Sequence, residues 1–219
     1  MSKLETLKML KELYIYRSYG FTYYKKREIM PEKPSASIPN SMDELRKNVF
    51  GCFLCTLCKT RKNVVFGEGN LNAKVMFVGE GPGFNEDLQG RPFVGNAGEL
   101  LTKMIENVLK IKRSEVYIAN IVKCRPPENR TPTPEEANMC KPYLFKQIEI
   151  VSPQIIVALG NTSYHYLTGD ERGITKVRGE IIDYKNAKLI PTFHPSYLLR
   201  NESAKKEAYQ DMLRVKALL

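Results

Sequence analysis

Three cysteine residues lie within a stretch of seven residues in the segment GCFLCTLCKT. Cys52 and Cys55 have the Cys-x2-Cys spacing of a metal site, and Cys58 repeats the same step. Two further cysteines, Cys124 and Cys140, stand far downstream. Four converging thiolates suit either zinc or an iron–sulfur cluster, and the spacing alone leaves both metals open.

A second group of reactive side chains follows the apolar segment KVMFVG. The glycine-rich loop after it contains Glu80, Glu86 and Asp87, but it lacks the Gly-Lys-Ser/Thr of a phosphate-binding loop and the pattern G-x-G-x-x-G. Acids would repel a bound phosphate, so these residues instead suit proton transfer, water activation or stabilisation of a positive transition state. For Asp87 we expect only a solvated carboxylate in a turn.

A third candidate is His194, in the segment PTFHPSYLLR. Pro195 restricts the backbone of His194 to an extended conformation, so a stiff loop presents the imidazole. Leu198 and Leu199 come next, followed by Arg200, and apolar tips beside a cation suit insertion into a nucleic-acid duplex. The alternative is a short helix that packs these leucines inward.

The elements that must position these side chains alternate between strand and helix patterns. Asn96 is expected to cap a helix that runs to about Leu109. Thr133 and Glu136 have capping-box spacing and predict the start of a helix that carries Cys140. Such alternation, with continuous apolar strands, predicts a parallel sheet covered by helices on both faces, with sites at the carboxyl ends of the strands. The predicted strands are residues 74–79, 116–121 and 155–160, with a weaker candidate at 187–193.

The length, hydrophobic content and net charge of the chain limit the classes of protein to which it can belong. The chain has 219 residues, 42% of them hydrophobic, and a formal net charge of +10, which favours a polyanion such as nucleic acid as its partner. We divide it into an N-terminal helical extension and linker, residues 1–40, and one domain, residues 41–219. It contains no apolar run of membrane-spanning length and no signal-peptide pattern, so we expect a cytoplasmic protein.

Taken in order along the chain, these segments resemble the uracil-DNA glycosylase superfamily. More narrowly, they resemble its thermostable iron–sulfur group, which is known from thermophilic bacteria and archaea. The resemblance runs from about Cys52 to Arg200, and the N-terminal extension is not part of it. It rests on C-x2-C, NVVFGEGN, VGEGPGFNEDLQGRPFVGNAG, ANIVKCRPPENR, the second distant cysteine and HPSYLL.

The resemblance implies both a fold and an activity. The fold is an α/β class, three-layer α/β/α sandwich around a short central parallel sheet of about four strands. The activity is hydrolysis of the N-glycosidic bond of deoxyuridine that is flipped out of double- or single-stranded DNA. This reaction leaves an abasic site and begins base excision repair of deaminated cytosine. A cytoplasmic, nucleoid-associated monomer without membrane contacts is expected.

The resemblance also assigns the cysteines. Cys52, Cys55, Cys124 and Cys140 match the ligands of a 4Fe–4S cluster, which is regarded as structural in this group. Cys58 falls outside that ligand pattern.

The same resemblance implies roles in the reaction for five further residues. Phe93 matches the aromatic residue on which the flipped base stacks, and Asn120 matches the amide that reads the base edge. His194 matches the histidine that donates a hydrogen bond to uracil O2. Glu80 and Gly81 stand where the superfamily places and activates water. Gly81 replaces the aspartate that serves some relatives as general base.

The remaining implied positions concern selectivity and DNA contact. Gly83 matches a position where another branch of the superfamily carries a tyrosine that blocks the methyl group of thymine. We hypothesise that Glu86 fills this space or helps to orient water. The implied DNA-binding residues are Ser196 for phosphate, Leu198 and Leu199 for the wedge, and Arg200, with Lys123, Arg125 and Arg130 as further phosphate-binding candidates.

Two other readings of the residues remain. A non-catalytic zinc or iron–sulfur nucleic-acid-binding module would keep the cysteines and the basic charge. It would not need Glu80, Phe93, Asn120 and His194 together. An α/β nucleotide-binding enzyme is disfavoured because the phosphate-loop lysine is missing.

Overall fold

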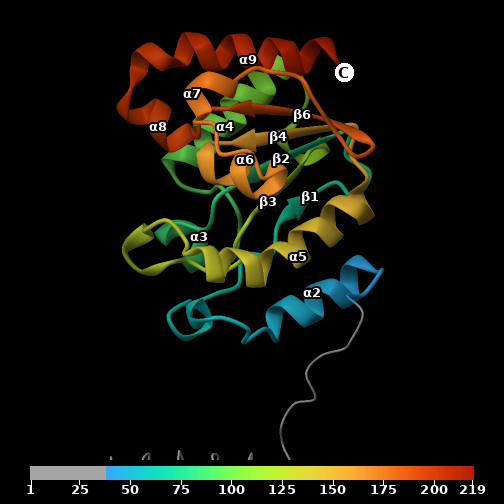
Figure 1. Cartoon of the computed structure of the whole chain (residues 1–219), viewed down its shortest axis with the longest axis vertical. Coiled ribbons are helices and arrows are strands. Elements are labelled where there is room, and N and C mark those ends of the chain that lie inside the picture. The colour runs from blue at the N-terminus through green and yellow to red at the C-terminus, as the bar shows by residue number, and fades with distance from the viewer. Residues whose placement is uncertain (1–37) are drawn as a thin grey trace, which may run out of the picture. The chain divides into compact units, whose positions relative to one another are not determined.

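A six-stranded mixed sheet lies at the centre of the structure, a computed structural model that describes residues 38–219 (Figure 1). The extension predicted for residues 1–40 lies outside the described residues, apart from its last three. The strand order is β1-β3-β2-β4-β6-β5. The bounds are β1 Glu68–Gly69, β2 Val75–Gly79, β3 Tyr117–Asn120, β4 Ile155–Leu159, β5 Ile182–Tyr184 and β6 Ala187–Thr192.

The four inner strands are the four that the sequence predicts. β3, β2, β4 and β6 pair in parallel, whereas β1 and β5 are antiparallel edge strands. The predicted count of about four strands therefore needs correction to six. The edge strands escape prediction because they contain only two and three residues and are half-buried or exposed, so they have no continuous apolar run.

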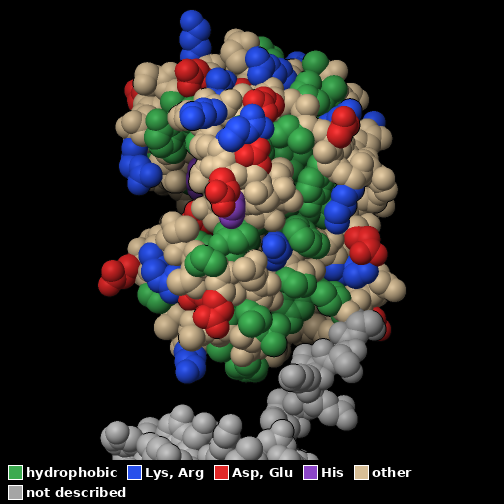
Figure 2. All heavy atoms as spheres, in the orientation of Figure 1, with side chains coloured by type: hydrophobic (Ala, Val, Ile, Leu, Met, Phe, Trp, Pro, Cys, Tyr) green, Lys and Arg blue, Asp and Glu red, His purple; other side chains and the backbone are tan. Residues whose placement is uncertain are grey.

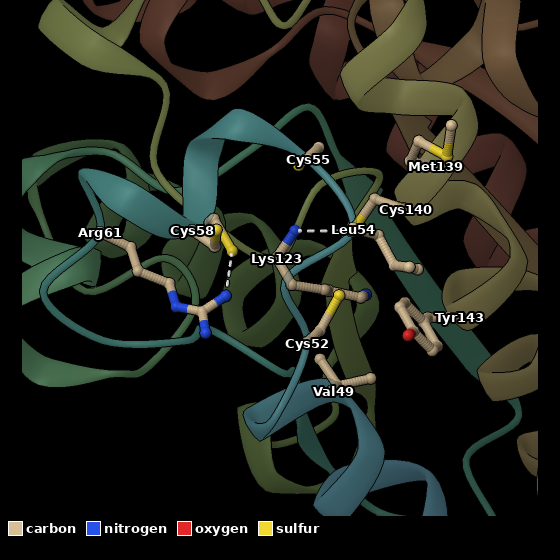
Figure 3. Close-up of a pocket in the computed structure, with 11 residues that line it drawn as sticks. Val49, Cys52, Leu54, Cys55, Cys58, Arg61, Lys123, Met139, Cys140 and Tyr143 are labelled. Carbon is tan, nitrogen blue, oxygen red and sulfur yellow. Dashed lines mark hydrogen bonds between the residues drawn. The ribbon is translucent and has the colours of Figure 1, made fainter. Parts of the chain in front are cut away.

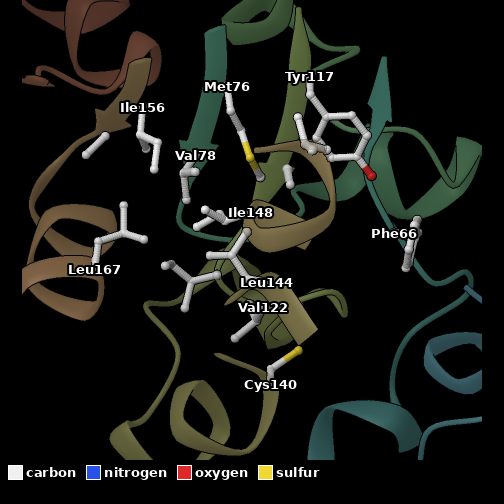
Figure 4. Close-up of a cluster of buried hydrophobic side chains, with 14 of the residues drawn as sticks. Phe66, Met76, Val78, Tyr117, Val122, Cys140, Leu144, Ile148, Ile156 and Leu167 are labelled. Atoms are coloured by element: carbon white, nitrogen blue, oxygen red, sulfur yellow. The ribbon is translucent and has the colours of Figure 1, made fainter. Parts of the chain in front are cut away.

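Alternate side chains of each inner strand enter two separate hydrophobic cores. On β2, Val75 and Phe77 enter one core while Met76 and Val78 enter the other. Figure 4 shows the second of these cores, in which Met76 and Val78 lie with Leu144 and Ile148 of α5.

Helices cover both faces of the sheet and complete the predicted three-layer α/β/α sandwich. Residues of α2 Met42–Phe50, α5 Pro134–Val151, α6 Asn161–Thr168 and α7 Ile174–Val177 pack in the core that contains Met76. Residues of α4 Asn96–Met104, α8 Pro195–Arg200 and α9 Lys205–Ala217 pack in the core that contains Phe77. The short helix α3, Phe84–Gln89, lies in the loop after β2. None of the helices in residues 38–219 has the length and hydropathy needed to cross a bilayer.

Helix α5 begins with the predicted capping box. The hydroxyl of Thr133 accepts the backbone N–H of Glu136, and the carboxylate of Glu136 accepts that of Thr133 at 2.8 Å. Arg130 also donates to Glu136, which lowers the pKa of this carboxyl to about 2. Thr56 donates to Glu136 at 3.1 Å, so the loop that contains Cys55 is tied to the start of α5.

Helix α4 begins differently from the prediction. Asn96 is its first residue, and the capping position is Gly95, whose backbone N–H donates to the carboxylate of Glu86 at 3.1 Å. The N–H of Val94 donates to the same oxygen at 3.0 Å. Glu86 supplies the acceptor because free N–H groups at a helix start favour a negative charge. A π-helical turn then extends the helix to Leu109, as the pattern predicted.

Candidate active site

A cleft of about 780 Å³ opens at the carboxyl ends of the parallel strands. Glu80 follows β2, Asn120 ends β3, and His194 follows β6. The cleft therefore lies where parallel sheets place their sites. It brings together these predicted residues: Glu80, Gly81, Gly83, Glu86, Phe93, Asn120, His194, Ser196 and Arg200.

Asn120 presents a buried amide to this cleft. The residue is 1% exposed, and its Oδ1 has no hydrogen-bond partner among the described residues. A Cβ at Gly79 would lie 2.5 Å from this oxygen and 2.7 Å from the ring of Phe93, so only glycine lets the two side chains approach. A buried acceptor without a partner costs about 1–3 kcal/mol, which a bound donor would recover.

Phe93 is held in an unusual backbone conformation beside Asn120. Its φ is 51°, in the left-handed region that a bulky residue rarely adopts. Arg113 donates to the carbonyl of Pro92 at 2.8 Å and so fixes the preceding peptide. A Cβ at Gly98 would lie 1.9 Å from the carbonyl oxygen of Phe93, so this close approach requires glycine. The ring is thereby fixed 5.6 Å from that of His194, at 34° to it.

His194 is neutral and has a defined tautomer. Its Nδ1 accepts the backbone N–H of Ser196 at 3.2 Å, and the hydroxyl of Ser196 lies 2.8 Å from the same nitrogen. The neutral ring therefore carries its proton on Nε2. Burial lowers the pKa of His194 to about 4, while the negative charge of Glu86 opposes this shift.

Glu80 and Gly81 directly follow β2 and line the cleft. Thr162, near the start of α6, donates to the Glu80 carboxylate at 2.5 Å. A Cβ at Gly81 would lie 2.7 Å from a methyl group of Val122, so a larger residue would have to displace that side chain. Thr162 was not among the predicted site residues, although its place shortly after the apolar strand β4 was a usable signal.

Glu86 also occupies the space beside Gly83. One carboxylate oxygen accepts the N–H groups of Val94 and Gly95 just before α4, and the other would be 2.8 Å from a Cβ at Gly83. A side chain at position 83 would therefore require the Glu86 carboxylate to move from its present position.

The structure contradicts two expectations in this region. Leu198 is 1% exposed and lies in the hydrophobic core, so it is not available as a wedge, whereas Leu199 is 42% exposed. Asp87 is buried rather than solvated, and it accepts the backbone N–H groups of Lys62 at 2.9 Å and Asn63 at 3.2 Å. Leu198 points inward while Leu199 does not, because adjacent residues of helix α8 face different sides of the helix.

All five cysteines line a second pocket. Cys140 of α5 lies opposite Cys52, Cys55 and Cys58 in Figure 3, and Cys124, from the loop after β3, lines the same pocket. All five are free thiols. Within residues 38–219, no three His, Cys, Asp or Glu side chains come close enough together to hold one metal ion. The thiols instead surround the pocket.

Negatively charged thiolates are stable in this pocket only when a bound positive group compensates their charge. Burial raises the pKa of the Cys124 thiol, and it raises that of Cys140 to about 12, so bare thiolates are unfavourable there. Two donors compensate: Arg61 donates to the sulfur of Cys124 at 3.1 Å, and the backbone N–H of Lys123 donates to that of Cys140 at 3.3 Å. These features fit a metal cluster bound by thiolates.

Comparison with known proteins places the chain in a family. The family model described as the uracil DNA glycosylase superfamily matches residues 66–214. A type-4 uracil-DNA glycosylase of Thermotoga maritima is 55% identical over 164 residues, which is 74% of this chain and 85% of that protein. Proteins of the same name from Saccharolobus solfataricus and Sulfurisphaera tokodaii are 46% and 45% identical, over 81% and 82% of this chain and 84% and 85% of theirs. The chain therefore belongs to the uracil DNA glycosylase superfamily.

Proposed function

We propose that this protein is a uracil-DNA glycosylase, which hydrolyses the bond between uracil and deoxyribose in DNA and leaves an abasic site. The observation that carries the proposal is the buried, unpartnered Oδ1 of Asn120 at the floor of a cleft. The names of the relatives support the same activity.

Recognition begins when the base leaves the DNA stack and enters the cleft. The ring of Phe93 offers a stacking surface worth about 1–3 kcal/mol. The Oδ1 of Asn120 accepts uracil N3–H, and its amide NH2 donates to O4. Cytosine presents an acceptor at N3 and a donor at C4, so the same amide would leave buried groups unpaired and reject it.

Bond cleavage then separates charge. The C1′–N1 bond breaks, and its electron pair stays on uracil as an anion with charge on O2. His194 donates its Nε2 proton in a hydrogen bond to that oxygen. The ring is already fixed and neutral, so this donor needs no reorganisation as the charge develops.

The deoxyribose carries positive charge at C1′ after cleavage and takes up water there. The backbone at Gly81 holds this water, with the carboxylate of Glu80 beside it to receive the released proton. Thr162 fixes that carboxylate. Water supplies the hydroxyl of the abasic sugar and releases a single proton, which passes from Glu80 to solvent and balances the charge of the departing uracil anion.

We further propose that the thiol pocket binds a 4Fe–4S cluster through Cys52, Cys55, Cys124 and Cys140. Sulfur donors from separate segments surround the pocket, and N–H groups donate to two of them. The cluster would link the loop after β3, the start of α5 and the segment after α2. A purely nucleic-acid-binding module is disfavoured because it does not explain Asn120 and His194 in one cleft.

The proposed DNA contacts lie at the rim of the cleft. Arg200 and Ser196 line it, and Leu199 is exposed next to them. Figure 2 shows Lys and Arg side chains interspersed with acidic ones on one face of the part of the chain that the structure describes. Action as a monomer on single- or double-stranded DNA, in the cytoplasm and at the nucleoid, stays a prediction.

The test uses an end-labelled oligonucleotide that contains one uracil, incubated with the protein and then with alkali. Cytosine and thymine oligonucleotides are the controls. Cleavage only at uracil, and only after alkali, supports the proposal. An intact uracil strand after incubation with folded, iron-loaded protein contradicts it.

Asn120→Asp sharpens this test. A carboxylate lacks the NH2 donor that faces O4, so uracil excision should fall by about 100-fold or more, while some activity on cytosine could appear. Uracil excision at the wild-type rate in Asn120→Asp or Asn120→Ala would show that Asn120 does not read the base.

A further inference from the structure

Lys123 is buried inside the domain rather than exposed for phosphate binding, which corrects the expectation for this residue. It is 1% exposed. Its ammonium donates to the backbone carbonyl of Asn120 at 2.8 Å and to the side-chain oxygen of Gln147 at 2.6 Å. Lysine is almost never fully buried unless its charge is paired or hydrogen-bonded, so this arrangement needs an explanation.

The backbone of the same residue contacts the thiol pocket. The N–H of Lys123 donates to the sulfur of Cys140 at 3.3 Å, and the next residue in the chain is Cys124. Figure 3 shows Lys123 between the cysteines of the two segments. Its carbonyl also accepts the N–H of Val65 at 2.8 Å. One residue thus joins the thiol pocket to the base-reading strand end.

The ammonium is itself held at a fixed point. Gln147 of α5 accepts from it and donates through its NH2 to the carbonyl of Phe66 at 2.9 Å and the hydroxyl of Tyr117 at 3.2 Å. Gln147 and Tyr117 are both fully buried. A buried polar network with paired members is rigid, so Lys123 transmits this rigidity to the carbonyl of Asn120.

We propose that Lys123 is a positioning residue, which holds the backbone of Asn120 so that its amide faces the uracil edge and which links this placement to the thiol pocket. The inference rests on the proposed function. Lys123 does not touch the base. It acts through the peptide of Asn120, and displacement of a substrate-aligning group by about 1 Å can cost up to about 100-fold in rate.

The test compares Lys123→Met with the wild type, each purified with its cluster. Methionine is close to lysine in length, lacks the ammonium and keeps the backbone N–H that binds Cys140. We expect unchanged iron content and visible absorbance, a single-turnover rate on uracil lowered about 10- to 100-fold, and a smaller ratio of uracil to cytosine excision.

Gln147→Met is the matched control. It removes the other partner of the ammonium but leaves the contact with Asn120. Both variants should lose thermal stability, but Gln147→Met should lower the uracil rate and the base ratio much less than Lys123→Met, because the ammonium keeps its hydrogen bond to the carbonyl of Asn120. Equal losses of rate in the two variants would show a structural role only and overturn the proposal.

The double variant Lys123→Met/Gln147→Met keeps the test decisive if the single variant folds poorly. Replacing both partners of a buried polar pair by apolar groups is often nearly neutral for stability. Recovered stability without recovered rate supports the proposal, and recovery of both overturns it. An inactive wild type would instead contradict the proposed function, so the two failures are distinguishable.

Discussion

The Nδ1 atom of His194 accepts a hydrogen bond from the backbone N–H of Ser196 at 3.2 Å. A backbone N–H can only donate, so this contact assigns the proton of the neutral ring to Nε2. Burial lowers the pKa of His194 from the usual 6.5 to about 4. The histidine is therefore a neutral hydrogen-bond donor over the physiological pH range.

The rate of uracil excision should stay level as pH falls through 6.5 and decline only near pH 4 on account of His194. The folded-state pKa lies below the unfolded one, so the fold favours the neutral ring. Its contribution to stability is full above pH 6.5 and is lost as pH falls towards about 4. Single-turnover rates across this range measure the first effect, and thermal unfolding measures the second.

His194→Gln is the control for this profile. Loss of one preorganised donor should lower the rate by about 100-fold or more. A decline in wild-type rate centred near pH 6.5 that is absent from His194→Gln would show that the ring titrates normally and would contradict the lowered pKa of His194.

Glu86→Ala should weaken both thymine rejection and the start of α4. The substitution empties the space beside Gly83 and removes the acceptor for the N–H groups of Val94 and Gly95. Leaving such N–H groups without an acceptor costs about 1–3 kcal/mol of stability. Glu86→Gln, which keeps an acceptor oxygen, is the matched control. If the uracil rate and thymine rejection are both unchanged in Glu86→Ala, Glu86 is a bystander in selectivity.

Leu199→Ala should lower excision from double-stranded DNA more than from single-stranded DNA. Leu199 is exposed and directly precedes Arg200, which lines the cleft, and only a duplex has a stack that a wedge must fill. Leu198→Ala is the comparison, because Leu198 is in the core and its truncation should cost about 2–5 kcal/mol of stability. Equal rate losses on the two substrates in Leu199→Ala would remove it as a wedge.

Cys58→Ser should leave the iron content per chain unchanged, whereas Cys55→Ser and Cys140→Ser should lower it. All three thiols line the same pocket, but only the latter two belong to the implied ligand set. Iron analysis and visible absorbance of purified protein provide the measurement. Loss of iron in Cys58→Ser, with iron retained in Cys55→Ser, would mean that Cys58 is the ligand.

The sequence by itself determined the features that depend on neighbouring residues. The strands β2, β3, β4 and β6 were predictable because buried parallel strands are continuous apolar runs. The capping box of α5 was predictable because Thr133 and Glu136 satisfy each other over a single turn.

Only the tertiary structure decided which polar side chains are buried. Lys123 and Asp87 are ordinary charged residues in the sequence, and their burial depends on Gln147 and on the backbone at Lys62, which are 24 and 25 residues away. The inward turn of Leu198 likewise depends on a core shared with α9. Contacts between distant segments leave no local pattern, because the chain must fold before these partners meet.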